Sequence, residues 1–329
     1  MASCRITEGW SIFIESKIVQ TIDELRLPKD FISTVSKWYA PVAEDVAFLA
    51  HMQANAMVIG VQGCQGSGKS TLSHFLKVML GEQHGLSAAV LSIDDFYLTK
   101  PQRKILARDV HSLLSTRGVP GTHDVALALS VISSLSELQE GEVCLVPRFD
   151  KAADDRVPKE QWSAVSGAVD VIILEGWCVG LTAQEEGELF SAVNELERQQ
   201  DSDLVWRQYV NKLLRGEYSK LFESLDYLLM IHVPSFTCVY QWRLLQEQKL
   251  IESLEQTNKS ASSSLQSAVN QTMSPEQLCH FISHYQRLTE HALKTLPGRA
   301  DWLLTMDEHH RFTGLERRLT KLKKDVGNG

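Results

Sequence analysis

The feature that most constrains this chain is a glycine-rich segment between a short apolar stretch and a helical one. Residues 63–70 read GCQGSGKS, which fits the pattern G-x-x-x-x-G-K-[ST]. The apolar stretch 57–61 is typical of a buried strand, and 71–80 has the period of a helix that Gly81 can end. Glycines permit a tight turn whose N–H groups face phosphate oxygens, and the helix adds its positive N-terminal end. The segment therefore predicts a phosphate-binding loop.

Two side chains of this loop have a direct chemical task. Lys69 is expected to reach the β- and γ-phosphates of a nucleotide, and the Ser70 hydroxyl is expected to ligate Mg²⁺. A glycine-rich turn with a solvent-exposed lysine is the alternative, and it leaves the crowding of Gly66 and Gly68 unexplained.

Short apolar, β-branched runs alternate with helical stretches along the rest of the chain. Their hydrophobicity is continuous rather than alternating, which is typical of strands buried on both faces. We therefore expect an α/β fold, the P-loop NTPase fold, with a doubly wound, mainly parallel sheet and helices on both faces. The expected strands are 57–61, 88–93, 142–146, 169–174, 227–233 and 302–305.

The chain divides by pattern into two parts. Residues 1–55 are predicted to form an amphipathic helical extension, and 56–329 the main domain. Within the main domain, 182–225 is expected to be a helical insertion, and the Ser-, Asn- and Gln-rich stretch 258–272 a mobile loop. A capping box at residues 274–277 predicts a helix from there to about residue 296. The basic stretch 317–324 is interpreted as a solvated helix end.

Charge and composition exclude several classes of protein. Lys and Arg number 33 and Asp and Glu 41, for a net charge of −8, which argues against a nucleic-acid scaffold. The apolar runs are too short to span a bilayer, and the N-terminal residues have no apolar signal core. The 6 cysteines form no CxxC pair, which favours reduced thiols. We expect a cytoplasmic protein that binds neither membrane nor nucleic acid.

Carboxylates follow two of the expected strands. Asp94 and Asp95 come after 88–93, and Glu175 comes after 169–174. Ligands of open parallel sheets bind beyond the carboxyl ends of the strands, so these acids are expected beside the bound phosphates. Acids in that place imply Mg²⁺ or an acceptor hydroxyl that must lose a proton. Because the chain has no Asn-Lys-x-Asp motif for reading guanine, the pattern favours a metabolite kinase.

At this point the chain resembles a known group of enzymes, the uridine kinase, phosphoribulokinase and pantothenate kinase superfamily. Within it, the chain is most similar to plant-type D-glycerate 3-kinases and their bacterial and fungal relatives. The similarity covers about residues 57–310. Its motifs are GCQGSGKSTL, SIDDFYLT, RGVPGTHD, VPRFDKAADDR, ILEGWCVG, VYQWRLLQE and MSPEQLCHFISHY.

The resemblance implies roles for individual residues. It makes Asp94 the catalytic base, Glu175 part of the Mg²⁺ shell with Ser70 and Asp94, and Arg243 a lid residue that reaches the transferred phosphoryl group. Lys69, Asp94 and Arg243 are thus the implied catalytic residues. The residues implied to hold ATP are Gly63, Cys64, Gln65, Gly66, Ser67, Gly68, Lys69, Ser70 and Thr71.

The acceptor pocket is expected at two neighbouring segments. The carboxylate of a small hydroxy acid needs a fork-shaped donor, for which Arg148, Lys151 and Arg156 are the candidates. Pairing of these cations with Asp150, Asp154 and Asp155 is the alternative. The other implied substrate contacts are Asp95, Tyr97 and His123. Asp124 is expected to cap a helix, and Trp242 is expected to lie in the core.

The function that follows is ATP-dependent phosphorylation of a hydroxyl on a small molecule, with D-glycerate giving 3-phosphoglycerate as the first choice. A kinase for another acceptor, such as a nucleoside or a pantothenate-like alcohol, is the first alternative. An ATP-binding regulatory protein without transfer activity is the second. Asp94, Asp95 and Glu175 argue against the regulator, because nucleotide binding alone needs no base.

Overall fold

A six-stranded sheet forms the centre of the molecule in the computed structural model, which describes residues 12–245 and 274–319. The strand order is β10-β9-β8-β1-β7-β2, and all neighbours are parallel except β9 and β10. The expected doubly wound α/β fold is confirmed. The strands are β1 Met57–Gly63, β2 Ala88–Ser92, β7 Val171–Gly176, β8 Tyr227–His232, β9 Trp302–Met306 and β10 Phe312–Arg317.

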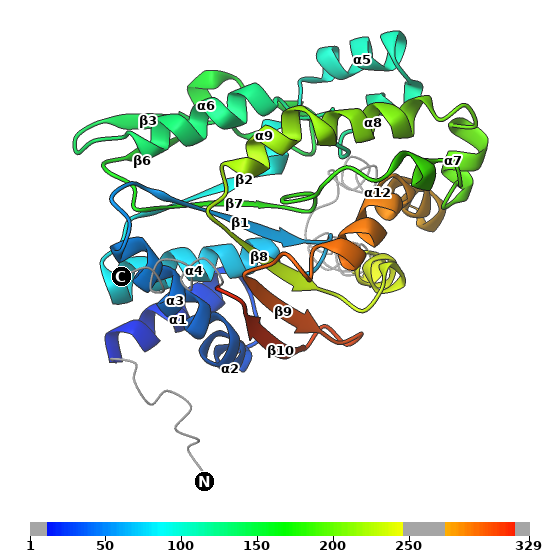
Figure 1. Cartoon of the computed structure of the whole chain (residues 1–329). Coiled ribbons are helices and arrows are strands. Elements are labelled where there is room, and N and C mark those ends of the chain that lie inside the picture. The colour runs from blue at the N-terminus through cyan, green and yellow to red at the C-terminus, as the bar shows by residue number, and fades with distance from the viewer. Residues whose placement is uncertain (1–11, 246–273, 320–329) are drawn as a thin grey trace, which may run out of the picture.

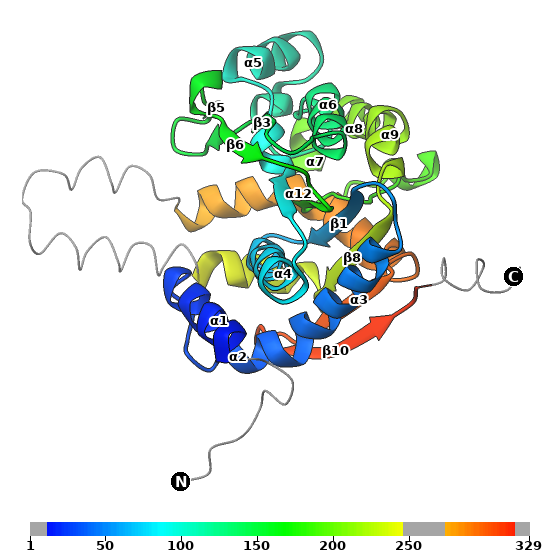
Figure 2. The same ribbon diagram turned by 90° about the vertical axis from the view of Figure 1, so that its left-hand side faces the viewer.

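Helices cover both faces of this sheet (Figures 1 and 2). One apolar core joins the sheet to α1, α3 and α4, and the other joins it to α6, α8, α9 and α12. Every residue of β1 and β7 is buried, which explains the unbroken hydrophobicity of both runs. The helices are α1 Ile12–Glu24, α2 Phe31–Thr34, α3 Ala40–His51, α4 Lys69–His84, α5 Lys100–Asp109, α6 Val125–Ser136, α7 Glu195–Gln200, α8 Val205–Arg215, α9 Glu217–Glu223 and α12 Pro275–Thr295.

Single turns of helix complete the chain between these elements. The π-helical turn η1, Val35–Tyr39, joins α2 to α3 without a break. The 3₁₀ turns are η2 Ile93–Phe96, η3 Ser112–Ser115, η4 Lys159–Gln161 and η5 Glu186–Leu189. Residues 182–225 hold η5 and α7 to α9 between β7 and β8, which is the helical content expected of an insertion. Among the described helices, none combines the length and apolar composition needed to cross a bilayer.

One expected strand of the central sheet lies elsewhere, and that expectation is wrong. Residues 143–146 form β3, which pairs antiparallel with β6, Ser163–Ser166, in a separate hairpin. Val143 and Leu145 are 57% and 40% exposed, so only alternate residues of this run are buried. A half-buried strand of alternating exposure suits a two-stranded ribbon rather than the interior of a parallel sheet. A shorter ribbon, β4 Phe149–Asp150 with β5 Asp155–Arg156, follows it.

Helix ends test the capping predictions. Ser274 accepts from the Gln277 N–H and Gln277 accepts from the Ser274 N–H, so the predicted capping box of α12 is confirmed, as is Asp124 as the N-cap of α6. The expected stop of α4 at Gly81 is wrong, because the helix continues to His84 and Gly85, with a φ of 65°, provides the left-handed cap. Of the predicted helix end 317–324, Arg317 is the last residue of β10, and 320–324 lie outside the described residues. The predicted loop 258–272 lies outside the described residues.

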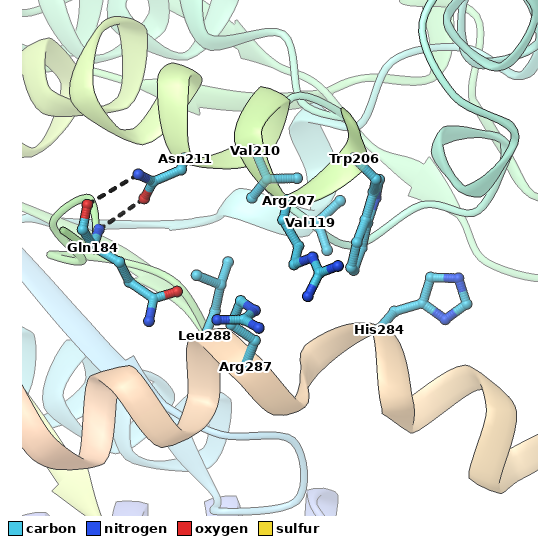
Figure 3. Close-up of a pocket in the computed structure, with 9 residues that line it drawn as sticks. All are labelled: Val119, Gln184, Trp206, Arg207, Val210, Asn211, His284, Arg287 and Leu288. Atoms are coloured by element: carbon cyan, nitrogen blue, oxygen red, sulfur yellow. Dashed lines mark hydrogen bonds between the residues drawn. The ribbon is translucent and has the colours of Figure 1, made fainter. Parts of the chain in front are cut away.

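Buried ion pairs fix α12 against the helical insertion. Figure 3 shows Arg207 from α8 and Arg287 from α12 reaching into one small cavity of about 10 Å³. Arg287 donates to both oxygens of Glu197 at 2.7 Å, and Arg207 donates to the same carboxylate at 3.2 Å. Asp201 accepts from Arg207 at 2.9 Å. These four side chains are buried, so the position of α12 depends on charge compensation inside the protein.

Removing one partner of this network is expected to destabilise the fold strongly. In Arg287→Met, the buried Glu197 still accepts from Arg207 but loses both hydrogen bonds from Arg287. The free energy of unfolding should therefore fall by about 3 kcal/mol. Urea unfolding followed by circular dichroism measures this change. Arg198→Met, which removes an exposed ion pair with Glu195, is the matched control and should leave stability nearly unchanged. Equal stability of both variants would contradict this role for the network.

Candidate functional site

The glycine-rich loop joins the end of β1 to the start of α4. Gly66 and Gly68 have φ angles of 79° and 86°, a region that residues with a Cβ rarely adopt. A Cβ on Gly63 would lie 2.4 Å from the Ser67 Oγ, so this glycine is required by close packing. Because Gly68 directly precedes the first residue of α4, the loop presents the positive end of that helix.

Two cavities lie against this loop and share two of its residues. One, of about 400 Å³, includes Gly66 to Thr71 in its lining. The other, of about 270 Å³, includes Gln65, Gly66 and Lys69. Gly66 and Lys69 therefore line both cavities, which places the phosphate-binding loop between them. This arrangement gives two ligands access to the same loop.

Glu175 brings a buried carboxylate to the loop from β7, the strand next to β1. Its Oε1 accepts from the Ser70 hydroxyl at 3.0 Å, and its Oε2 lies 3.9 Å from the Lys69 ammonium. Oε2 is buried and accepts no hydrogen bond among the described residues. A hydroxyl beside a carboxylate oxygen with spare acceptor capacity is a donor set that suits Mg²⁺, so Ser70 and Glu175 fit the expected metal site.

Asp94 follows β2 and lines the smaller cavity. Lys151 Nζ donates to it at 2.7 Å and the Tyr97 hydroxyl at 3.0 Å. Burial raises the pKa of Asp94, but Lys151 and Lys69 outweigh burial and hold the pKa at about 2. The carboxyl is therefore ionised at neutral pH. Because this pKa is depressed, the interactions stabilise the fold above the ordinary pKa of an aspartate and are lost as the pH falls toward 2.

The structure divides the predicted substrate residues into two groups. Tyr97, Lys151 and Arg243 line the smaller cavity with Asp94, as expected of a common site. Asp95 and Arg148 lie outside its lining. Arg148 donates to Asp95 at 3.0 Å, and the Phe149 N–H donates to the same carboxylate at 3.0 Å. This pair fastens the start of the β4–β5 ribbon to the end of β2.

Two further predicted contacts also lie outside the lining of that cavity. Arg156 donates to the Tyr97 carbonyl at 2.8 Å and pairs with Asp124 at 3.3 Å. His123 is buried, stacks on Tyr97 with ring centroids 4.4 Å apart, and has its Nδ1 2.6 Å from the Tyr218 hydroxyl. Burial lowers the pKa of His123 to about 4, so its ring is neutral at pH 7. Both residues contact Tyr97, which lines the cavity.

The alternative pairings of the three cations are also wrong. The side-chain partners of Lys151, Arg148 and Arg156 are Asp94, Asp95 and Asp124 respectively, instead of the neighbouring Asp150, Asp154 and Asp155. The chain folds back here, so acids distant in sequence lie closer to these cations than adjacent ones do.

Sequence reasoning missed four residues that line the smaller cavity: Arg117, Trp177, Phe281 and Tyr285. Arg117 begins the RGVPGTHD motif, and its guanidinium contacts Asp154 and the Phe149 ring. Phe281 and Tyr285 are four residues apart, and this helical spacing was a usable signal. The Tyr285 hydroxyl donates to the Arg117 carbonyl at 3.3 Å, so α12 contacts the segment that carries Arg117.

Arg243 lies on the helical residues 236–245 that follow β8. Its neighbour Trp242 is buried, which confirms the expected core position, and the Trp242 indole donates to the Glu308 carbonyl at 3.1 Å. The same indole packs against His310, with ring centroids 4.1 Å apart. The segment that carries Arg243 is therefore held against the turn between β9 and β10.

Comparison with known proteins identifies the group to which this site belongs. No family model matches the chain. Over 248 residues it is 31% identical to the "Probable ATP-dependent kinase TDA10" of Saccharomyces cerevisiae, a match that covers 70% of this chain and 75% of that protein. The chain belongs to this family of P-loop kinases.

One further relative and one solved structure are similar to this kinase. It is 32% identical over 198 residues to the chloroplastic D-glycerate 3-kinase of Arabidopsis thaliana, a match to 58% of this chain and 41% of the plant enzyme. The kinase thus matches less than half of that relative. A solved D-glycerate 3-kinase of Cryptococcus neoformans superposes with a TM-score of 0.67 at 24% identity, over 85% of this chain and 99% of that one, which confirms the fold.

Removing the Lys151 ammonium is expected to raise the pKa of Asp94 above about 2, because burial then opposes ionisation with one cation fewer. A ¹³C NMR titration of protein labelled at its aspartate carboxyl carbons measures this in Lys151→Met. The signal is assigned by its absence from Asp94→Asn. Lys159→Met removes an exposed lysine from η4 and should leave the titration of Asp94 unchanged. An unmoved midpoint in Lys151→Met would contradict the pairing.

Proposed function

We propose that this kinase transfers the γ-phosphoryl group of ATP to a hydroxyl of a small anionic hydroxy acid, with D-glycerate giving 3-phosphoglycerate as the first candidate. The observation that carries the proposal is the position of the phosphate-binding loop between two cavities. A nucleotide on the loop then has its terminal phosphate beside the cavity that holds Asp94. Donor and acceptor meet there without a large movement of the sheet.

The chemistry of the smaller cavity supports an anionic acceptor. Arg117, Lys151 and Arg243 bring positive charge to its lining, and Arg117 supplies the fork-shaped donor that a carboxylate prefers. The volume of about 270 Å³ suits a small metabolite. Among the described residues of the lining, the cations outnumber Asp94, the one acid, so an anionic hydroxy acid fits the cavity better than a neutral nucleoside.

The residues suggest how the transfer proceeds. Asp94 accepts the proton of the acceptor hydroxyl as that oxygen forms its bond to the γ-phosphorus, and the bond from this phosphorus to the β–γ bridging oxygen breaks to release ADP. Lys69 and Arg243 stabilise the negative charge of the transferred group. Mg²⁺, which Ser70, Glu175 and Asp94 are proposed to hold, supplies charge neutralisation at the β- and γ-phosphates when bound.

Lys151 couples binding of the acceptor to the base strength of Asp94. In the structure this ammonium is paired with Asp94, and 62% of its side chain is exposed. An incoming carboxylate competes for Lys151, and every weakening of the pair makes Asp94 a stronger base. The proposed base is therefore most effective when the acceptor is in place.

We also propose that the kinase works in a reducing compartment such as the cytoplasm. The five described cysteines are free, and Cys64, Cys144, Cys178 and Cys238 are buried. Burial raises the pKa of Cys64 to about 12, which keeps this thiol beside the phosphate-binding loop protonated.

The test of the acceptor is ADP release from MgATP in the presence of D-glycerate, uridine or pantothenate. We expect D-glycerate alone to stimulate ADP release. In Arg117→Met, the KM for D-glycerate should rise at least about tenfold, because the guanidinium that is proposed to pair with the substrate carboxylate is lost. Arg108→Met removes an exposed arginine of α5 and should leave KM unchanged. Stimulation by uridine or pantothenate instead would name another acceptor. No stimulation with tight ATP binding would favour a regulatory protein.

A further inference from the structure

A buried arginine outside the lining of the smaller cavity is connected to a cation that lines it. Arg103 of α5 is 1% exposed, and its guanidinium donates to the backbone carbonyls of Leu98 at 3.2 Å and Ser115 at 2.9 Å. It also donates to the Asp154 carbonyl at 2.6 Å and pairs with the Asp154 carboxylate at 3.0 Å. These contacts fix the guanidinium of Arg103 and tie Asp154 to it.

Asp154 connects this buried arginine to Arg117, which lines the smaller cavity. Asp154 lies in the turn between β4 and β5, and its other carboxylate oxygen accepts from the Arg117 guanidinium. Both guanidiniums lie near the ring of Phe149, 5.9 Å from its centroid for Arg103 and 5.5 Å for Arg117. A second nitrogen of Arg117 donates to the Lys151 carbonyl at 3.4 Å. The turn therefore holds the Arg117 side chain through a carboxylate, a ring and a carbonyl.

The charges of Arg103, Asp154 and Arg117 leave this trio able to attract an anion. Two guanidiniums and one carboxylate give the trio one positive charge in excess. Arg103 lies outside the described lining of the smaller cavity, whereas Arg117 belongs to it. The excess charge is therefore presented to the cavity by Arg117. If Asp154 paired with Arg117 alone, it would offset that charge instead.

We propose that Asp154 is a positioning residue for the acceptor. It holds one end of the planar Arg117 guanidinium, and the remaining donors of this group bind the carboxylate of the hydroxy acid. Because Lys151 belongs to the same turn and pairs with Asp94, the turn also sets the distance between Arg117 and the proposed base. The inference rests on the proposed function, since it assigns a residue that orients the acceptor of that reaction.

The backbone at Asp154 permits a substitution that changes the charge and keeps the turn. Its φ of 54° lies in the left-handed region, which asparagine and aspartate enter more readily than most residues with a Cβ. In Asp154→Asn, the KM for the acceptor that best stimulates ADP release should rise about fivefold, while kcat stays within about twofold, because an interaction common to ground state and transition state is weakened. Steady-state kinetics measure both.

A double-mutant cycle separates this role from a purely structural one. If Asp154 acts through Arg117, adding Asp154→Asn to Arg117→Met should leave KM at the value of Arg117→Met alone. Multiplication of the two effects, or an unchanged KM in Asp154→Asn, would overturn the proposal. Asp109→Asn is the matched control, since it removes an ion-paired aspartate at the exposed end of α5 and should leave KM unchanged.

A second variant covers the case in which Asp154→Asn fails to fold. Arg117→Lys keeps the positive charge but lacks the planar fork that can bind Asp154 and a carboxylate together. Its KM should rise at least about fivefold, because a point charge offers no second edge to the acceptor. A KM near that of the wild type would show that charge alone matters and would overturn the positioning role.

NMR tests the pairing without any acceptor. Rotation of the Arg117 guanidinium is followed in full-length protein labelled with ¹⁵N-arginine, and its signal is assigned by its absence from Arg117→Met. We expect slow rotation in the wild type and faster rotation in Asp154→Asn, because the carboxylate that holds the group is lost. Fast rotation in the wild type would overturn the proposal. Slow rotation with no acceptor phosphorylated would instead refute the proposed function and leave the pairing of Asp154 with Arg117 in place.

Discussion

The site depends on the charge of Lys69, which acts on two carboxylates from neighbouring strands. Its ammonium lies 3.9 Å from Glu175 at the end of β7. With Lys151, which has the larger effect, it also lowers the pKa of Asp94, which follows β2. Both acids have side chains that are at most 23% exposed, where an uncompensated negative charge is costly. The parallel order β1-β7-β2 brings all three groups to one edge of the sheet. The lysine and the two acids therefore compensate one another's charge, and the phosphates of ATP are proposed to bind beside them.

The walls of the two cavities are held by contacts outside this charged centre. Arg287 fixes α12 to the helical insertion, so Tyr285 stays against the segment of Arg117. His310 ties the β9–β10 turn to Gly66, and Trp242 ties the segment of Arg243 to the same turn. The smaller cavity, which is proposed to take the acceptor, is consequently assembled from several independent parts of the chain. Variation in these parts can change the acceptor without altering the phosphate-binding loop.

Sequence reasoning succeeded where one local pattern determines the structure. The loop at 63–70 and the strands of continuous hydrophobicity fold as expected, because both depend on neighbouring residues. It failed for the strand at 142–146, whose alternate exposure shows only once its antiparallel partner is known. It could not separate Lys151, which lines the cavity, from Arg156, which binds backbone carbonyls, since both are cations after a strand. Tyr285 was missed because its spacing from Phe281 indicates a shared face of α12, whereas tertiary packing decides that this face lines the cavity.

The measurement that tests the account most directly is phosphoryl transfer by Asp94→Asn. The substitution keeps the shape of the side chain and removes the carboxylate that is proposed to take the acceptor proton. We predict that kcat with the best acceptor falls by about two to four orders of magnitude. ATP should still bind, because the loop, Ser70 and Glu175 are untouched and the asparagine keeps a side-chain oxygen that can ligate Mg²⁺. A kcat near that of the wild type would show that Asp94 is not the base and would contradict the central claim.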